Sequence, residues 1–211
     1  MALIFRMSPS RAHSQLDEAA RMLARAFYEG SLFKFAFPEP RQRSRILPIF
    51  FKTIVEDAVR FGRVEVAYSG QITGLLIWYP PGRYPMTMAR ILRFLRQFLL
   101  IAAIHPVGTF KLFHVQLKLN RLRPKEPHCH GYYLGGCHGE HIGAQLIPQA
   151  LNEIDANEWP VYLETQEERA TKLYARFGFR MIHEKIETIP GGPPTWTMWR
   201  GPRAGVIANS R

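Results

Sequence analysis

Of the side chains able to move protons in the second half of this 211-residue sequence, three are candidates for catalysis. Tyr174 carries a phenol whose unperturbed pKa of about 10 keeps it protonated at neutral pH, so it can donate a proton to a leaving group. Glu164 ends one expected strand, and His130 lies in the strand expected before it. Either side chain can accept a proton from an attacking nucleophile, directly or through water. Glu164 is the preferred candidate base and His130 the second, while packing or structural hydrogen bonding is the alternative role for all three.

A glycine-rich segment, residues 135–144, lies between an expected strand and an expected helix and contains four glycines. Backbone N–H groups of such a loop, at the positive end of a helix dipole, form a binding site for a pyrophosphate. The segment by itself is a weak signal, and its place between strand and helix makes it more specific. We therefore expect a phosphate-bearing ligand to bind there.

Soft and borderline metal ligands also gather in this region. They are His128, Cys129, His130, Cys137, His138 and His141. Their spacing matches no recognised zinc motif, and we expect no metal site. Cys137 has no identifiable partner base, so a nucleophilic cysteine is not favoured either.

Composition limits the other functional classes. The 28 Lys and Arg residues against 17 Asp and Glu give a net charge of +11, and 46% of the residues are hydrophobic. That hydrophobic content predicts a compact single domain. The basic residues are not interleaved with aromatic ones, and neither an RNP-like strand nor a zinc-finger spacing is present, so we expect no nucleic-acid partner. A basic surface also suits an anionic ligand.

Cellular location is expected to be cytoplasmic. Two cysteines are too few for a disulfide scaffold, and the short apolar stretch at residues 2–5 does not match a signal peptide. The longest apolar run, residues 98–104, is far shorter than the roughly 20 residues of a spanning helix. We expect no membrane partner, and a homodimer is left open.

Hydrophobic periodicity and turn residues predict helices alternating with strands, which is typical of an α/β or mixed α+β domain with one central sheet. The helices are expected at about 14–28, 46–62, 142–156 and 168–177, with one or two more in a helical insertion at 84–125, broken near 106–108. The strands are expected at about 2–6, 64–68, 72–79, 130–134, 160–165, 179–187 and 195–200. Residues 201–211 are expected to be a short flexible tail.

Several strings of residues, spread over about 5–200, resemble one known family. They are Ala24 to Phe27, Ser31 to Phe33, Phe37-Pro38, Trp78 to Gly82, Tyr162 to Thr165, Arg169, Leu173 to Phe179 and Pro190 to Met198. In order and spacing they are similar to the GCN5-related N-acetyltransferase (GNAT) superfamily, especially the branch that contains puromycin N-acetyltransferase. The resemblance implies a twisted, mostly antiparallel sheet flanked by helices, in which two parallel strands splay apart to admit acetyl-CoA.

The resemblance also implies roles for individual residues. Tyr174 would protonate the leaving CoA thiolate, and Glu164 would be the base. The acetyl-CoA contacts would come from Gly136, Cys137, His138, Gly139, His141, Ile142, Gly143, Ala144 and Arg169. The pyrophosphate loop is shortened and altered relative to the family, with His138 and His141 at positions that usually hold Gln or Arg and Gly, and Ala170 replaces an expected asparagine.

The function implied is an acyl-CoA-dependent N-acyltransferase that transfers acetyl from acetyl-CoA to the primary amine of a small molecule by direct attack. The alternative is a catalytically silent relative that binds a ligand or a partner, with the 84–125 segment as its binding element. Binding of acetyl-CoA separates the two hypotheses.

Overall fold

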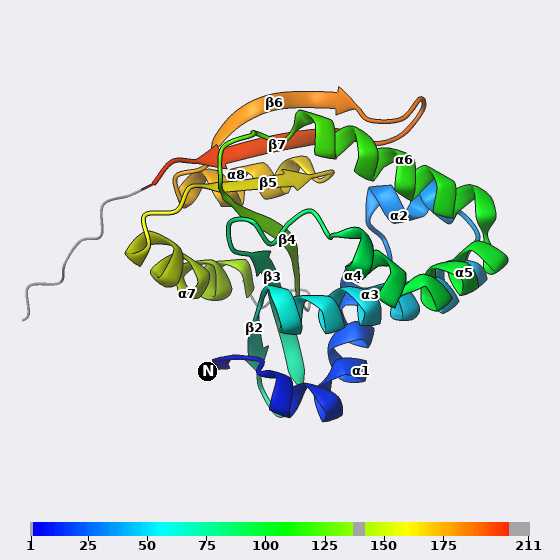
Figure 1. Ribbon diagram of the computed structural model, residues 1–211, viewed down its shortest axis with the longest axis horizontal. Helices are drawn as coiled ribbons and strands as arrows, with labels where there is room; N and C mark the ends of the chain where they lie inside the picture. The colour runs from blue at the N-terminus through cyan, green and yellow to red at the C-terminus, as the bar shows by residue number, and fades with distance from the viewer. Residues whose placement is uncertain (1, 137–141, 203–211) are drawn as a thin grey trace, which may run out of the picture.

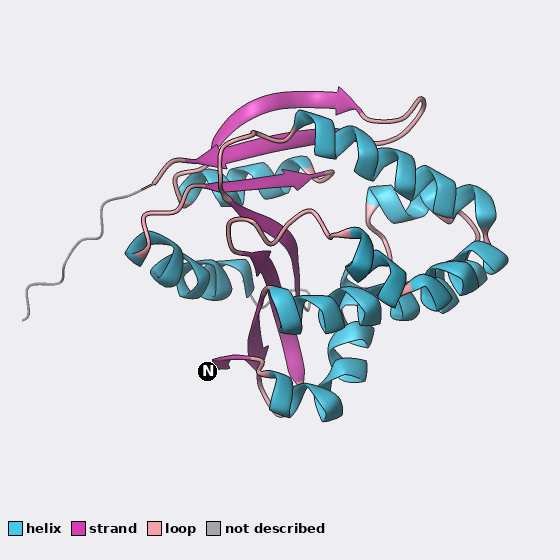
Figure 2. Cartoon of the chain, viewed as in Figure 1, coloured by secondary structure: helices cyan, strands magenta, loops and turns pink. Residues whose placement is uncertain are grey.

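The computed structural model of the chain describes residues 2–136 and 142–202. One sheet forms its centre, with helices on both faces (Figures 1 and 2). The strands are β1 (Leu3–Arg6), β2 (Arg63–Tyr68), β3 (Ile72–Tyr79), β4 (Cys129–Gly136), β5 (Val161–Thr165), β6 (Arg180–Glu187) and β7 (Pro194–Arg200). The helices are α1 (Pro9–Ala26), α2 (Ser31–Ala36), α3 (Pro40–Phe61), α4 (Met88–Arg93), α5 (Leu95–Ile104), α6 (Pro106–Leu122), α7 (Ile142–Ala156) and α8 (Glu168–Arg176).

The seven strands follow the order β1-β2-β3-β4-β5-β7-β6, and every neighbouring pair is antiparallel except β4 with β5. In Figure 1, β2 to β4 run down the picture while β5 to β7 run across its top, so the direction of the sheet changes at the parallel pair. The predicted fold class, a mixed α/β domain with a mostly antiparallel sheet flanked by helices, is confirmed. None of the helices in the described ranges is long and apolar enough to cross a membrane.

Two hydrophobic clusters lie on opposite faces of the sheet because side chains alternate along each strand. On β3, Leu75 and Ile77 pack with α1 and α3, whereas Leu76 and Trp78 pack with α7. All eight residues of β3 are buried, as expected for a strand covered on both faces. The sheet thus separates an α1/α3 face from an α7 face.

Most expected elements are found, with several differences. α1 and α3 begin five and six residues earlier than expected, and Ser31–Ala36 forms a short helix, α2, that hydrophobic periodicity did not indicate. The 84–125 segment contains three helices, α4 to α6, instead of one or two. β4 extends to Gly136, so the first two residues of the glycine-rich segment are paired with β3 and do not belong to a loop.

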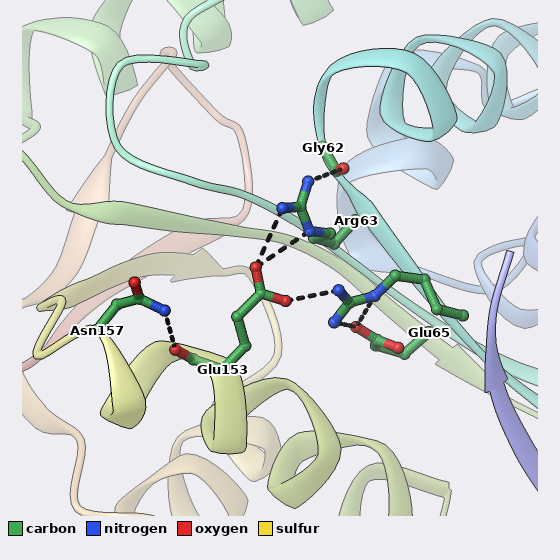
Figure 3. A network of polar contacts seen from close by, with 6 residues as sticks. Gly62, Arg63, Glu65, Glu153 and Asn157 are labelled. Atoms are coloured by element: carbon green, nitrogen blue, oxygen red, sulfur yellow. Dashed lines mark hydrogen bonds and ion pairs between the residues drawn. The ribbon is translucent and has the colours of Figure 1, made fainter. Parts of the chain in front are cut away.

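Ion pairs attach α7 to the edge of the sheet (Figure 3). Glu153 on α7 contacts Arg6 of β1 at 2.6 Å and Arg63 of β2 at 3.1 Å. Arg6 also reaches Glu65, whose side chain is fully buried. Burial alone would raise the pKa of Glu153, but the hydrogen bonds and charges of Arg63 and Arg6 outweigh it and hold that pKa below its usual value. The network orients the helix that begins beside the splayed strands.

A second ion pair lies at the same C-terminal end of α7 and joins the helix to β7. The Arg200 guanidinium, 2% exposed, meets both carboxylate oxygens of Asp155, at 2.5 and 2.7 Å. Its Nε donates to the carbonyl of Phe177 just beyond α8. Arg200 therefore ties β7 to α7 and α8 with one planar donor group.

Replacing Glu153 with Gln should lower the melting temperature at pH 7, by an amount corresponding to about 1 kcal/mol, because Arg63 loses its ionised partner and Arg6 keeps only Glu65. A group with a lowered folded-state pKa contributes stability above its unfolded pKa and loses that contribution as the pH falls. The difference between wild type and variant should therefore shrink as pH falls below about 4. Thermal unfolding at both pH values tests this. Glu56→Gln, which removes one helical ion pair with Arg60, is the control and should change little.

Candidate active site

The parallel strands β4 and β5 separate soon after they meet. Their pairing begins at Cys129 with Val161 and ends at Gly131 with Leu163. Beyond that point β4 stays paired with β3 and β5 stays paired with β7. The register of β3 against β4 shifts at the same level, between Ile77 and Trp78. A bulge of this kind bends the strand that carries the extra residue, so it directs β4 away from β5.

The bulge also changes which side chains face each side of the sheet. Tyr132 and Tyr133 are consecutive, yet both pack with the α1/α3 cluster. Alternation resumes with Leu134, which packs with the α7 cluster. Two phenol rings are thereby placed on one face, next to the gap between the strands.

The gap contains a cavity of about 50 Å³, lined by residues of β3, β4, α7, β5 and α8. This volume has room for one or two water-sized groups. Tyr132, Glu164 and Tyr174 are among its lining residues, and most of the rest are apolar. Glu164 is the one carboxylate that lines it within residues 2–136 and 142–202. Glu164 and Tyr174, the two residues predicted to be catalytic, thus border the same cavity.

Glu164 is mostly buried, with its side chain 11% exposed. Burial raises its pKa to about 7, and the Tyr162 hydroxyl and Arg123 oppose that rise without cancelling it. A carboxyl with this pKa is partly ionised at neutral pH, so it can release and accept a proton under ordinary conditions. This is the property that a general base requires.

His130, the second candidate base, lies in a closed environment. Its side chain is 1% exposed, and its ring stacks on Tyr84 with centroids 3.9 Å apart. Nε2 lies 3.4 Å from Glu164 Oε2, but the contact is not aligned as a hydrogen bond, and neither ring nitrogen has a partner among the described residues. Burial, with Arg123 and His128, lowers the pKa of His130 well below its usual value. It is therefore neutral and covered, and Glu164 is the more accessible base.

An aromatic wall, defined as Tyr79, Tyr84, Tyr132 and Tyr162, surrounds this pair of side chains. Tyr84 lies 5.0 Å from Tyr132 and 5.5 Å from Tyr79, measured between ring centroids. Tyr162 lies 5.8 Å from His130. The wall comes from three strands and from the loop after β3, so the α1/α3 side of the gap is aromatic.

The helical segment is anchored to this wall by a buried ion pair. Asp57 of α3, fully buried, pairs with Arg90 of α4, and it accepts a hydrogen bond of 2.8 Å from the Tyr79 hydroxyl. At the other end of the segment, the Arg123 guanidinium lies 5.3 Å from the centre of the Tyr84 ring. Tyr84 and Arg123, 39 positions apart, thus meet beside Glu164. We did not predict them from the sequence, because no local pattern marks them.

Tyr174 lies on α8 and lines the cavity. Its ring packs on Phe179 with centroids 5.7 Å apart, and burial raises its pKa to about 12. The phenol is therefore protonated at neutral pH. Gly178 adopts φ +87°, and the N–H groups of Phe179 and Gly178 return to the carbonyls of Tyr174 and Ala175. This glycine cap ends α8 one turn after Tyr174 and holds its backbone in place.

The predicted acetyl-CoA contacts divide into two groups. Cys137, His138, Gly139 and His141 lie outside the described residues. The described residues of the segment flank that gap: Gly136 ends β4, while Ile142, Gly143 and Ala144 form the first turn of α7. N–H groups in the first turn of a helix have no partner within the helix, so this end of α7 can donate to an anion.

Gly136 and Gly143 are explained by packing. A Cβ on Gly136 would lie 2.6 Å from the Ile142 side chain, and one on Gly143 would lie 2.6 Å from Leu173. These glycines let α7 approach β4 and α8 closely. Arg169 lies exposed on the first turn of α8. The roles of these three residues toward acetyl-CoA stay predictions.

The candidate metal ligands that the structure describes do not converge. Cys129 is buried against α7, and burial followed by the charge of Glu153 raises the pKa of its thiol to about 12. His130 lies on the opposite face, and the ring of His128 contacts Tyr162 and Trp199. Within the described ranges, no three His, Cys, Asp or Glu side chains are grouped to hold a metal.

Comparison with solved structures identifies the fold. The chain is similar to a protein described as histone acetyltransferase HPA2 and related acetyltransferase from Corynebacterium glutamicum, with 20% identity, a TM-score of 0.72, and coverage of 98% of this chain and 99% of that one. It is also similar to a polyamine N-acetyltransferase of Drosophila melanogaster, with 15% identity, a TM-score of 0.56, and coverage of 95% of this chain and 100% of that one. For arylalkylamine N-acetyltransferase 2 of Aedes aegypti the identity is 13% and the TM-score 0.53, with coverage of 94% of this chain and 98% of that one. Neither the protein-family models nor the curated protein sequences gave a match.

The chain therefore has the fold of the GNAT acetyltransferases over almost its entire length. This confirms the fold that the sequence resemblance implied, including the mostly antiparallel sheet and the splayed parallel pair. The likeness to the puromycin N-acetyltransferase branch stays a prediction.

Replacing Glu164 with Gln should stabilise the fold at pH 8 and have little effect near pH 4. The folded-state pKa of about 7 lies above the usual pKa of a glutamate side chain, so folding favours the protonated carboxyl. Its contribution to stability is present below the unfolded pKa and is lost as the pH rises through the folded pKa. Glutamine cannot ionise, so the variant does not lose this stability as the pH rises. At pH 8 its free energy of unfolding should exceed that of the wild type by an amount of the order of 1 to 3 kcal/mol.

Thermal unfolding of both proteins across this pH range measures the effect. Glu184→Gln, at an exposed position on β6, is the control and should show no such pH dependence. A variant of Glu164 that is less stable than wild type at pH 8 would contradict the raised pKa.

Proposed function

We propose that the protein is an acyl-CoA-dependent N-acyltransferase that transfers an acetyl group from acetyl-CoA to the primary amine of a small molecule. One observation carries this proposal: Glu164, with a pKa near 7, and Tyr174, a protonated phenol, line the same cavity in the gap between β4 and β5. An amine acyl transfer needs one group that takes a proton and one that gives a proton. These two side chains have those properties.

Acetyl-CoA would occupy the gap from the α7 side. The first-turn N–H groups of α7, at Ile142, Gly143 and Ala144, are the donors suited to its pyrophosphate. The side chains of Ile142 and Leu173 fill the space beside Gly136 and Gly143, so these glycines contribute backbone and close packing instead of empty volume. The positive end of the α7 dipole adds to the attraction.

The amine would enter from the opposite face, beside the aromatic wall. Ring faces attract cationic groups, so Tyr84, Tyr132 and Tyr162 suit an amine that arrives protonated. The solved structures most relevant to this step are described as a polyamine and an arylalkylamine N-acetyltransferase. Both descriptions name amines, which supports the acceptor class for this chain.

The residues would then act in order. Ionised Glu164 takes a proton from the amine, and the free nitrogen attacks the thioester carbonyl carbon. A carbon–nitrogen bond forms, the carbon–sulfur bond breaks, and Tyr174 gives its proton to the departing thiolate. The nitrogen then carries one proton more than an amide nitrogen, and it gives that proton to the Tyr174 phenolate, which restores the phenol. Glu164 releases the proton that it took to solvent. The products are the amide and CoA, and no covalent bond to the protein is needed.

Replacing Tyr174 with Phe should leave the affinity for acetyl-CoA unchanged and lower kcat by roughly 10- to 1000-fold, because only the proton donor is removed. Calorimetric titration with acetyl-CoA and release of free thiol with a panel of primary amines measure the two quantities. Tyr68→Phe, a partly buried tyrosine on β2, is the matched control. An unchanged kcat would exclude Tyr174 as the acid, and no binding of acetyl-CoA by the wild-type protein would favour the silent ligand-binding alternative.

The pH dependence of kcat/KM tests the base. Because the ionised carboxylate is the active form and the pKa of Glu164 is about 7, kcat/KM should rise with pH up to about 7 and then level off. Glu164→Gln should lower kcat/KM by roughly 100-fold or more and remove this rise. His130→Gln should retain the rise, since His130 is neutral throughout this range. If the rise disappears with His130→Gln and survives in Glu164→Gln, the roles are reversed.

A further inference from the structure

The outward surface of α4 to α6 exposes an unusual amount of apolar side chain. Nine of the twelve large hydrophobic residues exposed in the described chain belong to this segment. They are Met88, Leu92, Leu95, Leu99, Leu100, Val107, Phe110, Phe113 and Leu117, each 43 to 68% exposed. We call this set the apolar face. Concentrated exposure of this kind marks an interaction surface, whereas scattered single residues do not.

The side chains of the apolar face are different from those that pack these helices against the rest of the protein. α5 buries Ile101 in the α1/α3 cluster. α6 buries Val115 and Leu119, and Gly108 lies so close to α2 and Phe37 that a Cβ there would be 2.3 Å from the Ala36 carbonyl oxygen. On α6 the exposed apolar residues recur every three or four positions, so they form one stripe on the side away from these contacts. Figure 1 shows α5 and α6 at the margin of the molecule, far from α7.

The same segment carries most of the net positive charge. Residues 84–125 contain eight Lys and Arg and no Asp or Glu, a net charge of +8. The remaining residues contain 20 basic and 17 acidic side chains, a net charge of +3. Five of the eight cations, Arg93, Arg96, Lys118, Arg121 and Lys125, are exposed and form no salt bridge with any described residue. Exposed Phe and Leu next to unpaired cations are typical of helices that lie in a membrane interface.

We propose that the apolar face and its five exposed cations form a surface that binds anionic phospholipid membranes peripherally. The apolar side chains would enter the boundary between headgroups and acyl chains, and the cations would meet the lipid phosphates. A second copy of this chain is disfavoured as the occupant, because two surfaces that each carry five exposed cations and no acidic residue repel each other. The proposal differs from the expectation of no membrane partner, and it requires no spanning helix. It does not depend on the proposed enzymatic function.

Flotation with vesicles tests the proposal, using vesicles of phosphatidylcholine alone and of phosphatidylcholine mixed with phosphatidylglycerol. The wild-type protein should bind the mixed vesicles at least about tenfold more tightly, since each cation near an anionic surface contributes about 1 kcal/mol. Added salt should weaken the binding. Equal binding to both vesicle types, or no binding to either, would overturn the proposal.

Two pairs of variants separate the apolar contribution from the charge. Phe110→Ser with Phe113→Ser should reduce binding at least tenfold, and Met181→Ser with Ile182→Ser, on β6 and 42 and 41% exposed, should not. Lys118→Glu with Arg121→Glu should abolish the preference for phosphatidylglycerol. Arg41→Glu with Arg45→Glu, two exposed positions on α3, changes the net charge equally and should retain it.

Circular dichroism of each variant establishes that it is folded, as expected for exposed positions. Light scattering of the wild-type protein adds an independent outcome. If the protein forms a dimer that the Phe110 and Phe113 substitutions dissociate, and vesicles do not bind, the face is an interface between copies and the membrane proposal is wrong.

Discussion

The separation of β4 from β5 is the constraint on which the site depends. Parallel strands normally stay hydrogen bonded along their length, and here the pairing stops after Gly131 and Leu163. Each strand remains satisfied on its other side, by β3 and by β7, so the separation leaves only the facing edges unpaired. The gap connects the two faces of the sheet, and it is the reason that Tyr174 from the helix side and Glu164 at the end of β5 line one cavity.

The electrostatics of the site follow from where charges are neutralised. Asp57 is buried, and its negative charge is paired with Arg90 while its carboxylate also accepts a hydrogen bond from Tyr79. His130 is buried, has no hydrogen-bond partner among the described residues and stays neutral. Glu164 is left as the carboxyl whose ionisation falls near neutral pH, because burial disfavours its charge and Arg123 only partly compensates. The same burial that raises the pKa of Glu164 lowers the stability of the folded chain above neutral pH.

The helical segment between β3 and β4 has two separate surfaces. Its ends contribute Tyr84 and Arg123 to the surroundings of Glu164, and Arg90 docks its first helix on α3. Its outward side carries the apolar face and five unpaired cations. The side that borders Glu164 is held by buried contacts, and the side chains of the apolar face take no part in those contacts. A contact made on the outside of this segment would therefore act on an element that also borders the candidate site.

Local sequence patterns determined the types and order of most elements, because helical and strand periodicity are properties of neighbouring residues. The hairpin of β2 and β3, the helix carrying Tyr174 and the strand ending at Glu164 are examples. The resemblance also led to Tyr174 and Glu164 as the candidate pair. Neither source indicated α2, six residues enclosed between Gly30 and Phe37, where too few positions show a period.

Tertiary structure decided the features that depend on partners distant in the chain. Gly135 and Gly136 belong to β4 because Leu75 and Gly74 pair with them, and Gly136 is small because Ile142 occupies the space beside it. The bulge that places Tyr132 and Tyr133 on one face arises from register against β3. The meeting of Tyr84 with Arg123, and the pKa of Glu164, depend on burial by several elements together. Desolvation and strand register are set by the assembled chain, so no window of sequence contains them.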